Sequence, residues 1–84
     1  MYELRVARSA RKELDRLPDA VIARMARHLD ALPSEPRPRG CKKLRGASDL
    51  WRIRVGAYRI VYRVDDSAKV IEVRAIRDRK DAYG

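Results

Sequence analysis

The stretch KKLRGASDLWRIRVGAYRIVYRV, residues Lys42 to Val64, decides the fold of this chain. Apolar and charged residues alternate in it on both sides of Gly56-Ala57, and a period of two is typical of strands. A two-residue loop that begins with glycine suits a type II′ hairpin turn. We therefore predict a β-hairpin in which Arg54 lies opposite Arg59 and Ile53 lies opposite Ile60.

The predicted register sorts the hairpin side chains onto two faces. One face is apolar and aromatic and can receive helices; it holds Trp51, Ile53, Val55, Tyr58, Ile60 and Tyr62. The other face carries Arg52, Arg54 and Arg59. Like charges opposite one another in a sheet are destabilising by about 0.2 to 1 kcal/mol per pair, so stability does not account for this arrangement. A phosphate-binding function would account for the arrangement, because arginine keeps its charge and presents a planar fork of donors. A charged face that only prevents aggregation is the alternative.

Composition bounds the possible functions. The 84 residues are enough for one domain, residues 1–84, with a small core and little room for a deep pocket. Lys and Arg number 21 against 12 Asp and Glu, and the net charge of +9 favours nucleic acid, ribosomes or an acidic protein as partner. Cys41 is alone, which excludes an intramolecular disulfide and a cysteine-based metal cluster. Without an apolar run of membrane or signal-peptide length, we expect a cytoplasmic protein.

The remaining segments complete an α+β pattern. Alternation from Tyr2 to Val6 predicts an opening strand, and two helices follow, the first capped by Ser9 and the second by Asp19. The run PSEPRPRG, residues 33–40, predicts a loop, and residues 70–76 predict a last strand. The expected order is β-α-α-β-β-β, with an N-terminal helical hairpin packed on a mostly antiparallel four-stranded sheet.

The chain resembles a RelE-type toxin of the RelE/ParE toxin-antitoxin superfamily. The resemblance covers nearly the whole chain. It rests on the order and spacing of the opening strand, the double helix and three motifs: KLRG at residues 43–46, LWRIRVGAYRIVYRV at 50–64 and IRDRKDAY at 76–83. It implies a compact RelE-like fold and a type II toxin that acts without metal or cofactor. The implied activity is that of a ribosome-dependent endoribonuclease, an mRNA interferase that inhibits translation by cutting mRNA in the ribosomal A site.

The resemblance also assigns roles to residues. The implied catalytic set is Arg52, Arg54, Arg59, Arg79 and Tyr83. Further basic side chains near these positions are expected to bind RNA: Lys42, Lys43, Arg45, Arg77 and Lys80. In the implied reaction a 2′-hydroxyl attacks the adjacent phosphate, arginines stabilise the developing charge and Tyr83 stacks on or orients a base. The segment 33–40 adds Arg37 and Arg39, either as a solvated loop or as a guide for the phosphate backbone.

The general base is not evident from the sequence. The best-known relatives carry lysines at the positions of Arg52 and Arg54, and many carry a histidine that this chain lacks before its C-terminal tyrosine. Arginine resists deprotonation, so Arg52 is a poor substitute for a lysine base. Either the ribosome and substrate geometry do more of the work, or Arg52 only positions phosphate, or this member does not cleave RNA.

The resemblance implies partners as well. We expect a cognate RelB-like antitoxin whose acidic segment covers the basic surface, the ribosome with its mRNA, and operator DNA only through the antitoxin complex. No membrane partner is expected. Two other functions stay open: a ParE-like toxin that inhibits DNA gyrase, and a basic nucleic-acid-binding module without toxicity.

Overall fold

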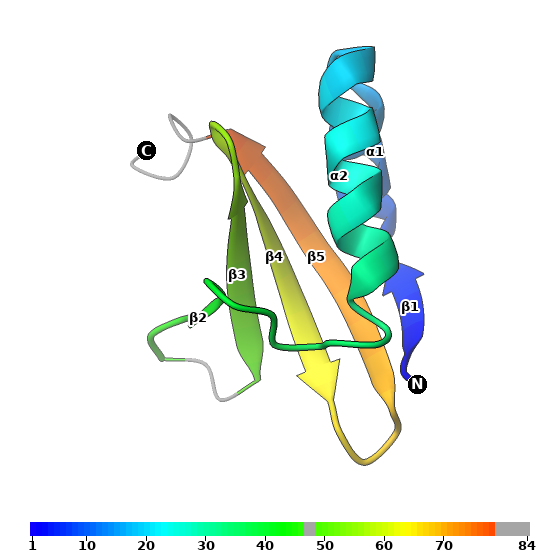
Figure 1. Cartoon of the computed structure of the whole chain (residues 1–84), viewed down its shortest axis with the longest axis vertical. Coiled ribbons are helices and arrows are strands. Elements are labelled where there is room, and N and C mark those ends of the chain that lie inside the picture. The colour runs from blue at the N-terminus through cyan, green and yellow to red at the C-terminus, as the bar shows by residue number, and fades with distance from the viewer. Residues whose placement is uncertain (47–48, 79–84) are drawn as a thin grey trace.

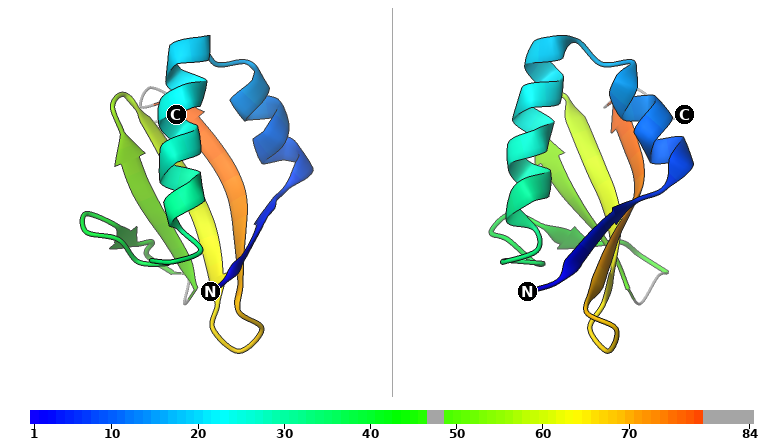
Figure 2. Two further views of the ribbon diagram at one scale, coloured as in Figure 1. Left: turned by 45° about the vertical axis from the view of Figure 1, so that its right-hand side comes forward. Right: turned by 90° about the vertical axis from the view of Figure 1, so that its right-hand side faces the viewer.

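The computed structural model describes residues 1–46 and 49–78 and confirms the α+β class (Figure 1). Its elements in chain order are β1 (Glu3–Val6), α1 (Arg8–Asp15), α2 (Asp19–Ala31), β2 (Lys42–Lys43), β3 (Leu50–Val55), β4 (Tyr58–Asp65) and β5 (Val70–Asp78). Both helices lie on the same side of one sheet, as the two views of Figure 2 show. The predicted N-terminal helical hairpin is therefore present. No helix in the described part of the chain is long and apolar enough to cross a membrane.

Within the described residues the sheet has five strands rather than the expected four, in the order β1-β5-β4-β3-β2. The additional strand is β2, whose residues Lys42 and Lys43 pair with Arg52 and Trp51. Two residues are too few to show a period of two, which explains why the sequence did not predict this strand. The described strands pair mostly antiparallel, as predicted, and among them only β1 runs parallel to its neighbour β5.

The central hairpin has the predicted register. Ile53 pairs with Ile60 and Arg54 pairs with Arg59. Gly56 has a φ of 61°, whereas Ala57 is not among the described residues with positive φ. This combination is that of a type II′ turn, because a type I′ turn requires positive φ at both central residues.

The predicted helix caps are wrong by one or two residues. Helix α1 begins at Arg8, and Ala7 rather than Ser9 occupies its N-cap position. The Ala7 N–H donates to the carbonyl of Val73 at 2.9 Å, so the chain enters the helix directly from its pairing with β5. Helix α2 has Pro18 at its N-cap position, and Asp19 lies in the first turn, where its charge complements the helix dipole.

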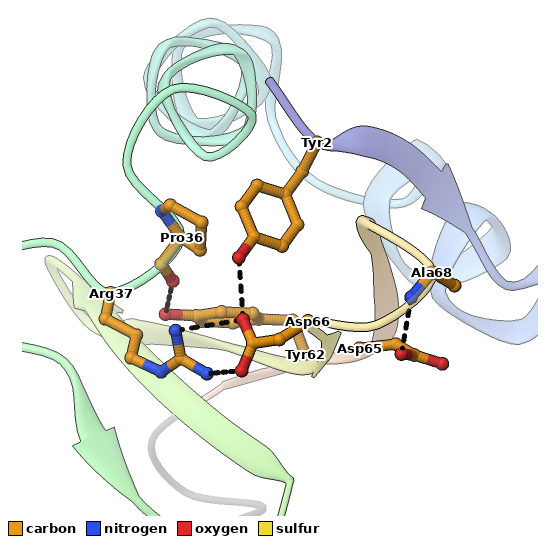
Figure 3. A network of polar contacts seen from close by, with 7 residues as sticks. All are labelled: Tyr2, Pro36, Arg37, Tyr62, Asp65, Asp66 and Ala68. Atoms are coloured by element: carbon orange, nitrogen blue, oxygen red, sulfur yellow. Dashed lines mark hydrogen bonds and ion pairs between the residues drawn. The ribbon is translucent and has the colours of Figure 1, made fainter.

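The core lies between the helices and the inner face of the sheet. It combines apolar residues of α1, α2 and the C-cap of α2 with inward-facing residues of β3, β4 and β5: Ala10, Met25, Leu29, Leu32, Ile53, Val55, Ile60, Tyr62, Val64, Ile71, Val73 and Ile76. Tyr62 is the largest fully buried side chain, and burial raises the pKa of its phenol. Its hydroxyl donates to the carbonyl oxygen of Pro36 at 2.8 Å (Figure 3), which satisfies the buried polar group.

A polar network fixes the segment 33–40 to the rest of the fold (Figure 3). Arg37 Nη2 lies 2.8 Å from Oδ2 of Asp66 in the turn between β4 and β5, and the Tyr2 hydroxyl donates to Oδ1 of Asp66 at 2.6 Å. These hydrogen bonds, first that of Arg37, lower the pKa of the Asp66 carboxyl. Arg37 also lies 5.1 Å from the ring centroid of Trp51. The segment therefore has a defined course from α2 to β2 (Figure 1).

Candidate nucleic-acid interface

The face of the sheet that points away from the helices carries arginines from β3 and β4. Ile53 and Ile60 are buried beneath the helices, so the residues that alternate with them point to the opposite face. Arg54 and Arg59 pair directly on that outer face, and Arg52 lies two residues earlier on the same side. The predicted grouping of these three arginines is therefore correct.

One line of residues across three strands is entirely cationic. Arg54 of β3 is opposite Arg59 of β4, which in turn is opposite Arg77 of β5; we call these three residues the cationic row. Because Val55 and Tyr58 close the two-residue turn, Arg54 and Arg59 form a non-hydrogen-bonded pair, in which Cα atoms are about 4.5 Å apart. The strands thus hold two like charges side by side.

Among the described residues, acidic side chains neutralise this row only at its Arg77 end. Within residues 1–46 and 49–78, no carboxylate pairs with Arg54 or Arg59. Arg77 is paired, with its Nη1 2.9 Å from Oε2 of Glu13 in α1. The other oxygen of Glu13 accepts a hydrogen bond from the Ile76 N–H at 3.2 Å. The uncompensated charge is therefore concentrated at Arg54 and Arg59.

The remaining predicted site residues do not all lie on the outer face. Lys42 is opposite Arg52 and joins the outer face, whereas Lys43 is opposite Trp51 and belongs to the helix-facing side. Arg45 is exposed in the turn that follows β2. Three further predictions, Arg79, Lys80 and Tyr83, lie outside the described residues.

Sequence reasoning missed Glu13, the partner of Arg77. Its contacts with β5 join positions 63 and 64 residues apart in the chain, so no local pattern indicates them. A weak signal exists: Glu13 is the only acidic residue of α1 before Asp15 and lies among basic residues in the segment RSARKELD.

The outer face is suited to binding phosphate and to stabilising negative charge. Guanidinium groups keep their charge and offer two parallel donors to a pair of phosphate oxygens. The described residues between the arginines, Val61 and its partner Ala75, are apolar and supply no proton acceptor. His28, the only histidine, is exposed on α2 and lines a hollow beside the edge of β3 rather than the outer face.

Comparisons with known proteins match a ParE family model and RelE-type toxins. The family described as ParE toxin of type II toxin-antitoxin system, parDE, matches residues 4–83. Toxin RelG of Mycobacterium tuberculosis is 29% identical over 98% of this chain and 95% of that protein. A RelE-like toxin protein of Escherichia coli is 33% identical over 98% of this chain and 90% of that protein.

Solved structures give the same result. The RelE-RelB complex from Pyrococcus horikoshii OT3 matches with a TM-score of 0.84 and 35% identity, covering 93% of this chain and 94% of that one. The isolated E. coli RelE toxin matches with a TM-score of 0.82 and 30% identity, covering 93% of this chain and 84% of that one.

Proposed function

Because this chain belongs to the RelE/ParE superfamily and is a RelE-like toxin of a type II toxin-antitoxin system, we propose that it kills or arrests cells as a ribosome-dependent mRNA endoribonuclease. The observation that carries this proposal is the pair Arg54 and Arg59, held opposite each other without a carboxylate partner in the described residues. Such a pair costs stability in the absence of an anion. A phosphodiester in a tightly bound message offsets that cost.

The chemistry that fits this surface is cleavage by the RNA itself. The 2′-hydroxyl oxygen attacks the adjacent phosphorus and loses its proton, the bond to the 5′-oxygen breaks, and that oxygen gains a proton. The products are a 2′,3′-cyclic phosphate and a 5′-hydroxyl. Arg54 and Arg59 stabilise the negative charge that develops on the phosphorane oxygens. The resemblance adds Arg79 to this role and assigns base stacking to Tyr83.

Orientation of the substrate supplies the part of the rate enhancement that charge stabilisation by the arginines does not. Because the arginines do not act as bases, the ribosome is proposed to hold the A-site codon in the geometry that in-line attack needs. Arg52 and Lys42, which lie opposite each other on β3 and β2, are proposed to bind flanking phosphates. Lys43, Arg45 and Lys80 add to the electrostatic attraction of RNA.

A RelB-like antitoxin is the proposed regulatory partner. Several structural relatives were solved as RelE-RelB complexes, including the one from P. horikoshii. An acidic antitoxin segment over the outer face would compete with RNA for the same arginines. Binding of operator DNA is proposed only for the complex with the antitoxin.

The direct test uses ribosomes programmed with a defined mRNA and an empty A site. Primer extension is expected to show a cut within the A-site codon with the wild-type toxin and none on naked mRNA. Arg59→Ala should abolish the cut, whereas Arg63→Ala, a change of the same type on the same strand and face, should retain it. An intact message with the wild-type toxin on ribosomes that translation factors can still use would refute the nuclease proposal.

The second candidate function is inhibition of DNA gyrase. It is favoured by the matching family description, which is that of the ParE toxin, and by the replacement of both expected lysines with Arg52 and Arg54. A supercoiling assay distinguishes the two candidates. A gyrase poison would trap cleaved DNA in this assay, whereas the nuclease should leave gyrase activity unchanged.

A further inference from the structure

A second basic surface lies around the edge of β3 and adjoins the cationic row at Arg54. It is a hollow between α2, the segment 33–40 and β3, which we call the edge hollow. Six of its lining residues are His28, Glu35, Arg39, Gly40, Ile53 and Arg54. Arg54 belongs both to this hollow and to the cationic row, so the two surfaces are continuous.

Basic side chains outnumber acidic ones around the edge hollow. Arg39 and Arg54 line it together with one carboxylate, that of Glu35. Arg24 precedes His28 by one helical turn and therefore projects from the same side of α2. Its guanidinium packs against the hairpin turn, where a Cβ on Gly56 would lie 3.4 Å from Nη1 of Arg24. Positive charge thus continues from the outer face past the turn to the helix layer.

The backbone of β3 presents one unpaired position to this hollow. In the β3–β4 pairing the odd-numbered residues bond toward β4, so the N–H and C=O of Arg54 point to the other side. Strand β2 ends its pairing at Arg52, and no described residue supplies a backbone partner to Arg54. Since the turn follows at Gly56, the open edge is only one outward-facing residue long. That is too short for an added strand, which needs alternate residues along an edge.

We propose that the edge hollow binds a phosphate of the RNA strand as that strand leaves the outer face, with Arg39 as its additional contact. An N–H group, guanidiniums and a short open edge suit an anion better than a peptide strand. This inference rests on the proposed nuclease function, because that function identifies the RNA as mRNA. The binding test below does not require the protein to cleave RNA. The hollow lengthens the contact with the message beyond the phosphates on the sheet.

The test measures binding of single-stranded RNA to the purified toxin by fluorescence anisotropy over a range of salt concentrations. A trinucleotide, which the outer face alone can hold, is compared with a longer oligonucleotide. Each phosphate contact adds about 0.7 to the slope of log K against log salt for single strands. Arg39→Gln should lower this slope by about 0.7, and the affinity at 0.1 M salt by about fivefold, for the longer RNA only.

Two matched variants sharpen this measurement. Glu35→Gln removes the carboxylate that lines the hollow and should strengthen binding of the longer RNA. Arg11→Gln makes the same charge change as Arg39→Gln on α1, which packs against β5 on the opposite half of the sheet, and should leave the slope unchanged. Thermal unfolding checks that all variants are folded.

The proposal is overturned if Arg39→Gln and Arg11→Gln bind the longer RNA equally well, or if Arg39→Gln weakens the trinucleotide to the same extent. It is also overturned if Arg39→Gln leaves RNA binding intact but weakens binding of the antitoxin, because the hollow would then serve an acidic protein. Binding is measured without ribosomes and without cleavage. An absent A-site cut would therefore refute the nuclease proposal alone.

Discussion

Two rows of residues cross the outer face of the sheet, and they differ in how their charges are arranged. Near the hairpin turn, the cationic row places Arg54, Arg59 and Arg77 opposite one another. At the other end of the same strands, a second line of paired residues places Arg63 opposite Glu72 and Glu72 opposite Arg5; we call it the mixed row. The first row has one sign of charge, and the second alternates.

The mixed row is neutralised further by its neighbours. Arg63 Nε lies 2.5 Å from Oδ2 of Asp49, and Arg5 is paired with Glu3. This chain is therefore able to balance arginine on a sheet with nearby carboxylates. Because the cationic row lacks such partners at Arg54 and Arg59 in the described residues, its charge is best explained by an external anion.

The largest expected effect comes from removing a charge of the cationic row, compared with removing one of the mixed row. Arg59→Ala should slow A-site cleavage by about 100-fold or more, the loss seen when one preorganised donor to a developing oxyanion is deleted. Arg63→Ala should change the rate by less than about threefold, because its charge is already compensated by Asp49. Single-turnover cleavage on saturating ribosome complexes measures both. Equal losses in the two variants would remove the functional distinction between the rows.

A second change makes the cationic row resemble the mixed row. Val61 lies opposite Arg52 and two residues from Arg59, so Val61→Glu would place a carboxylate among the arginines. We expect cleavage to fall by roughly tenfold, since a charge-assisted pair worth about 1.4 kcal/mol now competes with the phosphate. Val61→Gln is the control for size. If both variants cleave at the same rate, steric effects rather than charge account for the loss.

The reverse change makes the mixed row resemble the cationic row. Asp49→Asn leaves Arg63 without its carboxylate partner and should increase affinity for single-stranded RNA by a few fold at low salt, with a slope steeper by up to about 0.7. Cleavage should not become faster, because the freed charge lies at the wrong end of the strands. Anisotropy and single-turnover assays together test this pair of outcomes, and faster cleavage would show that position on the face is unimportant.

The local part of this picture was predictable from sequence. Alternation on both sides of Gly56 predicts the hairpin, its register and therefore the opposition of Arg54 and Arg59, because all of this information lies within a few neighbouring residues. The start of α1 was not predictable in the same way. Ala7 is fixed by a hydrogen bond to Val73, 66 positions later, which overrides the capping preference of Ser9.

Compensation of charge was also beyond local patterns. Neutralisation of Arg77 depends on Glu13 reaching β5, and that of Arg63 depends on Asp49 reaching β4, contacts that only the tertiary structure creates. The edge hollow has the same origin, because α2, the segment 33–40 and β3 meet only in the fold. The sequence therefore indicates which arginines share a face of the sheet, and the structure indicates which of them have a carboxylate partner among the described residues.

The smallest expected effect is a difference between the two rows in how Tm changes as the pH falls. The hydrogen bond from Arg63, above all, holds the pKa of the Asp49 carboxyl below its ordinary value. A group whose pKa is lower in the folded state stabilises the fold above its unfolded pKa of about 3.9, and this contribution is lost as the pH falls through the folded pKa. Asp49→Asn should therefore show a slightly smaller drop in Tm than the wild type between about pH 5 and pH 2.

Arg54 and Arg59 provide the contrast within the same protein. No described carboxylate pairs with either, so Arg54→Gln should leave the shape of the acid profile unchanged, even though it removes repulsion and raises Tm at every pH. Circular dichroism melts across this pH range give Tm as a function of pH. They distinguish a uniform increase in Tm from a Tm that depends less on pH. A flattened profile for Arg54→Gln would mean that an acidic group does compensate the cationic row, and the argument for an external anion would lose its basis.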